Sequence, residues 1–138
     1  MPARLTSLQP HPASTAAVKM RTEQDIDGLA RLKANWDGYA SAPLNPDILA
    51  SARKLIRSLA RQFPIAIPNV IPMTGGRMQF EWHKGRKSLE LEIEDAETIH
   101  YLKWDPGQDF QEEGSYSILD TARSIVLLQW FAGEAPYV

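Results

Sequence analysis

The fold is decided by residues 78–93, which read MQFEWHKGRKSLELEI. Apolar and polar residues alternate on both sides of the central K-G-R-K, and this period of two is typical of β-strands with one buried face. The glycine at position 85 allows the chain to reverse between the two runs. We therefore predict two antiparallel strands joined by residues 84–87, with an apolar face that another layer must cover.

The segments on either side of this hairpin extend the predicted sheet. Residues 98–104 follow a turn at 95–97 and indicate another strand, while residues 74–77 indicate an earlier hairpin turn. Prolines at positions 64, 68 and 72 confine any strand between them to a short edge strand. The sequence thus predicts a meander of three to four antiparallel strands, followed by a polar loop over residues 105–117.

Two helices are predicted before the sheet. Thr22 and Asp25 have the spacing of a capping box, and apolar residues then recur at helical spacing, which predicts a helix over residues 23–35. Asn45 and Pro46 are residue types preferred at an N-cap and at the first helical position. The apolar residues that follow fall on one arc and predict a strongly amphipathic helix that stops before the proline at 64.

A third helix is predicted at the C-terminal end. Ser117 and Asp120 form a second capping-box pattern, which predicts a helix over residues 118–131 with Gly133 as its stop. The fold class is therefore α+β, with two N-terminal helices, a three- to four-stranded antiparallel meander and a C-terminal helix packed on one face of the sheet.

Length and composition favour a single domain. The 138 residues and their 43% apolar content suit one globular core. The chain has no cysteine, which excludes disulfides and thiolate metal sites and favours a cytoplasmic location. No apolar run approaches the length of a membrane helix, so we expect no membrane association. Residues 1–21, which hold three prolines, are predicted to form an irregular arm before one α+β domain at 22–138.

The formal net charge of −2 conceals an asymmetry along the chain. Residues 1–62 hold nine Lys or Arg against five Asp or Glu, whereas residues 63–138 hold six against twelve. The two parts either attract each other within the fold or present faces of opposite sign. The total charge argues against general nucleic-acid binding.

The polar face of the predicted sheet contains the candidate catalytic residues. The turns place Glu81 opposite Glu90 and Glu92 opposite His100, with His83 on the same face. Carboxylates and imidazoles are common general acids and bases, so we take Glu81, His83, His100 and Asp37 as weak catalytic candidates. An ordinary solvated sheet face has the same pattern, and we favour that interpretation. Leu102 and Trp104 would share this face, which indicates either that one end of it is covered or that the register differs by one residue.

The loop that follows the first helix is a candidate ligand loop. Two aromatic residues flank an acid and a glycine there, at Trp36, Asp37, Gly38 and Tyr39. The alternative, which we favour, is that Trp36 completes the core stripe of the first helix while Asp37 and Gly38 shape its exit.

A basic stripe lies on the polar side of the second helix, at Arg53, Arg57 and Arg61. It could contact phosphates or an acidic partner. The favoured alternative is a solvated helix face that pairs with the acidic C-terminal half of the chain, because no aromatic residue interleaves with the arginines to stack on bases.

The last predicted helix is apolar nearly all round in its second half. Leu127, Leu128, Trp130 and Phe131 cannot all point toward one core, so they predict either a central buried helix or an association surface. We adopt the surface as the working hypothesis. No phosphate loop, nucleophile elbow or zinc-ligand motif occurs, so we predict no metal and no cofactor, and we favour a non-enzymatic protein.

Two stretches carry a resemblance to a known group of proteins. Residues 35–45 include N-W-D-G-Y-A and A-P-L-N, and residues 75–83 read GGRMQFEWH before the alternation at 89–93. With the last helix, they resemble a family of small, uncharacterised bacterial proteins over most of residues 22–131. The resemblance implies an accessory gene of a mobile element, a setting of antitoxin, immunity and defence-related proteins. It implies no catalytic residues.

Three functional hypotheses follow. The first is a non-enzymatic module for protein–protein interaction or self-association, antitoxin-like, immunity-like or otherwise defence-related. The second is a small metal-dependent or acid–base hydrolase that uses the face of Glu81, His83 and His100. The third is a nucleic-acid-binding accessory that uses the arginine stripe, and the charge and the lack of aromatic residues count against it.

Overall fold

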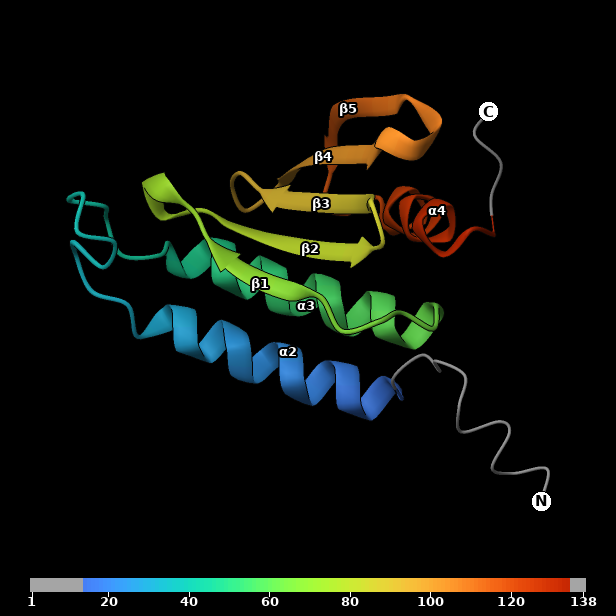
Figure 1. Ribbon diagram of the computed structural model, residues 1–138. Helices are drawn as coiled ribbons and strands as arrows, with labels where there is room; N and C mark the ends of the chain where they lie inside the picture. The colour runs from blue at the N-terminus through green and yellow to red at the C-terminus, as the bar shows by residue number, and fades with distance from the viewer. Residues whose placement is uncertain (1–13, 135–138) are drawn as a thin grey trace, which may run out of the picture.

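The structure is a computed structural model and describes residues 14–134 (Figure 1). The helices are α2 (Thr15–Ala30), α3 (Pro46–Gln62) and α4 (Thr121–Ala132), with short 3₁₀ turns η1 (Thr74–Gly76) and η2 (Pro106–Gln108). Five strands form one antiparallel sheet in chain order: β1 (Asn69–Pro72), β2 (Met78–Lys84), β3 (Lys87–Ile93), β4 (Thr98–Asp105) and β5 (Phe110–Ser117). The predicted α+β class is confirmed, with one strand more than expected.

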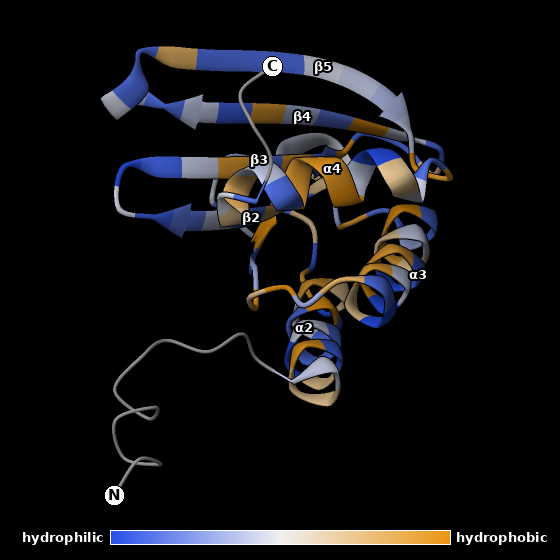
Figure 2. Cartoon of the chain, turned by 90° about the vertical axis from the view of Figure 1, so that its right-hand side faces the viewer, coloured by the Kyte–Doolittle hydropathy of each residue, from blue (hydrophilic) through white to orange (hydrophobic). Residues whose placement is uncertain are grey.

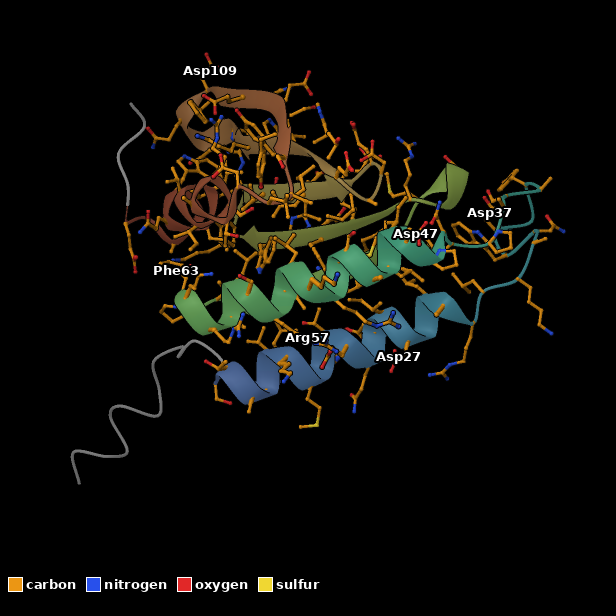
Figure 3. The ribbon with its side chains drawn as sticks, turned by 180° about the vertical axis from the view of Figure 1, so that it is seen from behind. Asp27, Asp37, Asp47, Arg57, Phe63 and Asp109 are labelled. Atoms are coloured by element: carbon orange, nitrogen blue, oxygen red, sulfur yellow. The ribbon has the colours of Figure 1, made fainter. Side chains whose placement is uncertain are left out.

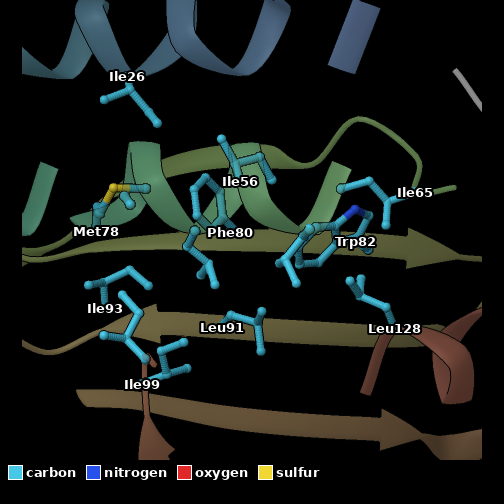
Figure 4. Packing of buried hydrophobic residues seen from close by; sticks show 14 of the residues in the cluster. Ile26, Ile56, Ile65, Met78, Phe80, Trp82, Leu91, Ile93, Ile99 and Leu128 are labelled. Carbon is cyan, nitrogen blue, oxygen red and sulfur yellow. The ribbon is translucent and has the colours of Figure 1, made fainter. Parts of the chain in front are cut away.

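The central hairpin has the predicted register. Glu81 pairs with Glu90 across β2 and β3, and Glu92 pairs with His100 across β3 and β4. The alternate side chains of these strands are buried against the helices, and Phe80 and Leu91 are fully inaccessible to solvent. Figure 4 shows Phe80 beside Ile56 of α3. The period-two pattern therefore selects the buried face because a slip of one residue would expose every apolar side chain.

Helix α3 forms the middle of the molecule and matches its prediction. The Asn45 side chain caps it by accepting the Asp47 N–H at 2.8 Å, and the helix ends at Gln62, before the proline. In Figures 2 and 3, α3 lies between α2 and the sheet. One apolar arc of α3 thus contributes to packing against both neighbours, and residues such as Ile56 and Leu59 are fully buried.

Helix α2 is longer at its N-terminus and shorter at its C-terminus than predicted. It begins at Thr15, where Ser14 Oγ accepts the Ala17 N–H at 3.1 Å, and it ends at Ala30. Residues 15–21 are therefore helical rather than part of an irregular arm, and the arm's residues 1–13 lie outside the described residues. Thr22 is fully buried within the helix and caps nothing. Packing against α3 extends the stripe of Val18, Thr22 and Ile26 upstream, which the local capping pattern did not reveal.

Strand β5 replaces the loop that was predicted for residues 105–117. Its side chains are mostly polar and exposed, so it shows no apolar alternation. Gly114 is needed opposite Tyr101, because a Cβ at position 114 would lie 3.0 Å from Tyr101 Cε1. The strand forms because its backbone pairs with β4, a contact that does not require apolar side chains.

Helix α4 starts three residues later than predicted. Asp120, rather than Ser117, is its cap and accepts the Arg123 N–H at 3.1 Å, while Ser117 Oγ accepts the Leu119 N–H. Gly133 ends the helix at φ 80°, as the sequence predicted. Between residues 14 and 134, no helix combines the length and the apolar character needed to cross a membrane.

Candidate functional site

The candidate site is the face of the sheet turned away from α3 and α4, which we call the outer face. In Figures 1 and 3 the helices lie on the other side of the sheet, and no described helix covers the outer face. The registers place the alternate residues of β2 to β5 on it: Gln79, Glu81, His83, Ser88, Glu90, Glu92, His100, Leu102, Trp104, Gln111, Glu113 and Ser115.

One polar cluster lies over β2 and β3. The amide of Gln79 donates to Glu81 Oε1 at 2.5 Å and to Glu90 Oε1 at 3.2 Å, so it bridges two carboxylates that face each other. His83 Nε2 lies 3.2 Å from Glu81 Oε2. Gln79 is itself buried by these neighbours. The amide and the imidazole reduce the repulsion that directly opposed carboxylates would otherwise suffer.

Glu90 is a carboxylate of this cluster whose pKa is raised. Partial burial raises its pKa first, and the opposed Glu81 raises it further, while His83 and Gln79 act in the other direction. Burial disfavours the ionised carboxylate because the surrounding protein solvates charge less well than water does. Glu90 therefore holds a proton at higher pH than an ordinary glutamate.

A second polar cluster lies over β4 and β5 around His100. Its Nε2 lies 3.4 Å from Glu113 Oε2, and its Nδ1 lies 3.2 Å from Ser115 Oγ and 3.9 Å from Glu94. The imidazole thus lies between the carboxylates of Glu94 and Glu113.

A shallow hollow of about 350 Å³ lies at the end of the outer face near the β2–β3 turn. Trp104 forms one wall and is 47% exposed, which is unusual for the largest apolar side chain. His83, Ser88 and Glu90 line the hollow, together with Arg86 of the turn. An aromatic wall beside charged and hydroxyl groups suits a ligand or partner side chain with both apolar and polar parts.

The outer face is acidic. Its carboxylates are those of Glu81, Glu90, Glu92, Glu94 and Glu113. Against them stand the guanidinium of Arg77, which lies 2.8 Å from Glu92, and that of Arg86 at the hollow. A partner with a basic surface would therefore be attracted to this face.

The structure brings together only part of the predicted catalytic set. Glu81 and His83 are in contact, but His100 belongs to the separate cluster with Glu113, and Asp37 belongs to neither. Among residues 14–134, no group of three or more acidic or imidazole side chains is arranged to hold a metal ion. Proton transfer by Glu90 or His83 at the hollow is the chemistry that these positions support best.

The predicted ligand loop is a self-bonded turn. Asp37 accepts the Tyr39 N–H at 2.9 Å and the Ser41 hydroxyl at 2.5 Å, and the Ser41 hydrogen bond is the main reason that its pKa is lowered. The Trp36 indole donates to the Ala42 carbonyl at 2.9 Å and packs partly buried against the core. The polar groups thus shape the exit of α2, while Tyr39 projects outward and is 88% exposed.

The arginine stripe does not stand free. Arg53 lies 2.8 Å from Asp27 and Arg57 pairs with Glu23, so two of the three guanidinium groups bind carboxylates of α2 (Figure 3). Arg61 lies at a groove between the two helices that Lys19 and Lys54 also line. The predicted pairing with the acidic C-terminal half is therefore wrong for Arg53 and Arg57, whose partners lie in α2.

The predicted interface on the last helix is wrong for three of its four residues. Leu127, Leu128 and Trp130 are at most 2% exposed and belong to the core, and Phe131 packs partly buried against it. The Trp130 ring is covered by polar side chains, since the ammonium groups of Lys87 and Lys103 lie 4.4 and 5.3 Å from its centroid. Lysine side chains thus help to bury Trp130, whereas Val126 on the same helix is 50% exposed.

Sequence analysis missed a polar cluster between α4 and the inner side of β4 and β5. Tyr101 Oη donates to Glu112 at 3.0 Å and accepts from Arg123 at 3.1 Å, while Lys103 lies 3.1 Å from Glu112. The partly buried Tyr116 forms a hydrogen bond with the Ser124 hydroxyl, and desolvation of its own hydroxyl raises the pKa of Tyr116 to about 12. The alternation of Tyr101 and Lys103 with Leu102 places both side chains on the inner side of β4. Their partners on β5 could not be predicted, because the polar sequence of residues 110–117 predicts a loop.

Comparisons with family models, curated proteins and solved structures gave no match to this chain. The resemblance to small bacterial accessory proteins therefore stays a prediction. The geometry of the outer face is the basis for the functional argument that follows.

Proposed function

We propose that this protein is a non-enzymatic protein–protein interaction module whose contact surface is the outer face. The observation that carries the proposal is Trp104, which is 47% exposed on an acidic sheet face that no described helix covers. The half-buried Leu102 lies on the same face. An exposed tryptophan that is buried on binding within a ring of polar groups is a common source of binding energy in protein interfaces.

The charge of the outer face indicates the kind of partner. Five carboxylates share this surface with few cations, so a partner with a basic surface would associate faster and in one preferred orientation. We propose further that the protein acts in a bacterial cytoplasm in an antitoxin-like, immunity-like or defence-related role. In such roles a small protein acts by binding another macromolecule and needs no catalytic group of its own.

Affinity capture from the native host tests this proposal. Wild-type protein, Trp104→Ala and the control Leu119→Ala are immobilised, and bound proteins are identified by mass spectrometry. Leu119 is a suitable control because it is 86% exposed but lies outside the outer face. We expect one partner that wild type and Leu119→Ala retain in equal amount and that Trp104→Ala loses by tenfold or more. Equal capture by all three proteins would exclude the outer face as the interface.

A second candidate function is supported by the altered pKa of Glu90. A carboxyl group that holds its proton beside His83 and Ser88 in the hollow is suited to acid–base hydrolysis. In a screen of ester, phosphoester and glycoside substrates, hydrolysis that disappears in Glu90→Gln would support this candidate. Activity that survives Glu90→Gln would assign the hydrolysis to another site or to a contaminant.

A further inference from the structure

The two edges of the sheet differ in the backbone groups that they present. Ile118 N–H donates to the Glu97 carbonyl at 2.8 Å, and hydrogen-bonded pairs alternate along an antiparallel ladder. The even-numbered residues of β5 therefore bond to β4. The N–H and C=O groups of Gln111, Glu113 and Ser115 therefore point away from the sheet, whereas the Ser117 C=O accepts the Asp120 N–H at 2.9 Å.

At the other edge, the Met73 N–H donates to the Arg77 carbonyl, so the odd-numbered residues of β1 bond to β2. The groups of β1 that point outward are then those of Val70 and Pro72, and Pro72 has no N–H. Strand β1 is only four residues long, Pro68 precedes it, and α2 packs beside it (Figure 1). Prolines and a covering helix are common means of protecting a sheet edge.

Strand β5 has none of these protections. It is eight residues long, contains no proline, and is the last strand of the sheet, with no described strand beyond it (Figures 1 and 2). Both of its acidic side chains bend back onto β4. Glu112 lies 3.1 Å from Lys103, and Glu113 lies 3.4 Å from His100. The charge of Glu112 is thus paired with Lys103, and the Glu113 carboxylate is turned toward β4 rather than outward.

The parity of β5 also limits how a second copy could pair with it. The outward backbone groups belong to odd-numbered residues. In an antiparallel pair related by a two-fold axis, these residues must therefore lie opposite odd-numbered residues of the other copy to form hydrogen bonds. Centring on Glu113 would place that carboxylate opposite itself, which is unfavourable. Centring on Gly114 pairs all of residues 111–117 and places Glu113 opposite Ser115 of the other copy, so that no carboxylate faces another.

We propose that a second copy of this chain adds its β5 antiparallel to the first, centred on Gly114, to form a continuous ten-stranded sheet. This inference goes beyond the proposed function, because it adds a second contact surface at the edge of the sheet and names the partner that occupies it. Backbone hydrogen bonds supply the contact, so the pairing needs no apolar patch on the edge. It also joins the two acidic outer faces into one surface across a two-fold axis.

Substitutions at Ser115 test the register by sedimentation equilibrium over a range of concentrations. The wild type dimerises. Ser115→Lys, which places an ammonium opposite Glu113 twice per dimer, lowers the dimer dissociation constant about tenfold, and Ser115→Glu raises it about tenfold. Ser115→Ala is the matched control and leaves the constant unchanged within about twofold. A wild type and a Ser115→Lys variant that are both monomeric at millimolar concentration overturn the proposal.

Disulfide trapping gives an independent measure of the register, because the chain has no cysteine of its own. Under oxidation, a mixture of Glu113→Cys and Ser115→Cys chains forms the mixed disulfide faster than either variant forms its own. The paired Cα atoms of a hydrogen-bonded antiparallel pair lie about 5.5 Å apart, within disulfide range. A faster Glu113→Cys homodimer would overturn the Gly114-centred register.

Ser115→Pro separates failure of this inference from failure of the proposed function. The substitution removes an outward N–H and leaves the ladder to β4 intact, so the circular dichroism is unchanged while the dimer is lost. A monomeric wild type whose captured partner is lost in Ser115→Pro but retained by Ser115→Ala would assign the backbone edge to another protein and overturn self-pairing. If the dimer dissociation constants of the Ser115 variants change as expected but Trp104→Ala captures the partner as well as wild type does, the β5 edge is the dimer contact. The outer face is then rejected as the interaction surface.

Discussion

The inner face of the sheet is packed by different chemistry at its two ends. Beneath β2 and β3 the contacts are apolar, as between Phe80 and Ile56, and the residues are fully buried. Beneath β4 and β5 the contacts join aromatic rings to cations and carboxylates, as between Tyr101, Arg123 and Glu112. The comparison teaches that one small domain can be closed by an apolar core at one end and by paired polar groups at the other.

The largest expected effect is at the apolar end. Replacing Phe80 by Ala removes a fully buried ring between β2 and α3 and leaves a cavity, which should lower the free energy of unfolding by about 3–5 kcal/mol. Urea unfolding followed by circular dichroism measures it. The control Tyr39→Ala removes an aromatic side chain that is 88% exposed and should change stability by at most about 0.5 kcal/mol. Similar losses for both variants would contradict the assignment of the core.

At the polar end, a single added methyl group tests how tightly Tyr101 lies over β5. Gly114→Ala places a Cβ 3.0 Å from Tyr101 Cε1, so we expect a loss of about 1–3 kcal/mol in the free energy of unfolding. In a Tyr101→Leu background the ring is absent, and the same substitution should cost much less. Equal costs in both backgrounds, in a double-mutant cycle, would show that the ring does not contact position 114.

The buried hydroxyl of Tyr116 should make stability depend on alkaline pH. Its pKa is raised to about 12, above the ordinary value of 10.0, mainly by burial. The stability that its neutral form contributes is therefore complete below pH 10 and is lost as the pH rises toward 12. Tyr116→Phe should cost about 1 kcal/mol at pH 7 through the lost Ser124 hydrogen bond and should lose less stability in that alkaline range. Parallel pH profiles for the two proteins would contradict burial of the hydroxyl.

The smallest expected effect is on the outer face. The raised pKa of Glu90 means that its favourable contribution is complete at acid pH and declines as the pH rises through the raised pKa. Glu90→Gln removes the repulsion by Glu81 and should raise the free energy of unfolding by about 0.2–1 kcal/mol at pH 7. Denaturant unfolding at pH 7 and pH 4 measures it, and the advantage should shrink at pH 4. A loss of stability at pH 7 would show that the Gln79 bridge needs the Glu90 carboxylate.

Sequence patterns predicted the apolar end well and the polar end poorly. The register of β2 and β3 and the cap of α3 at Asn45 follow from local rules, because apolar periodicity and capping act over a few neighbouring residues. The start of α2 was not predicted because it depends on contacts with α3, which is distant in the chain. The Thr15 hydroxyl donates to the Ala60 carbonyl, and Glu23 pairs with Arg57. The pairing of Glu81 with Glu90 was predicted, but the separation of His100 from them was not.

The candidate site shows the same division. The opposed carboxylates of the outer face and the shared position of Trp104 could be predicted, since strand parity places them there. The exposure of Trp104 and the burial of Trp130 could not, because each depends on which distant parts of the chain pack over the ring. Lys87 and Lys103 cover Trp130, whereas no described helix covers the outer face.

By itself, the sequence determined the α+β class, the amphipathic α3 and the two faces of the central hairpin, because these depend on the spacing of apolar residues along the chain. The tertiary structure decided that residues 110–117 form a strand, that α4 is core and that β5 is the open edge. Those outcomes depend on backbone pairing and on cation–aromatic contacts between distant residues. Such contacts leave no periodic trace in the order of the amino acids.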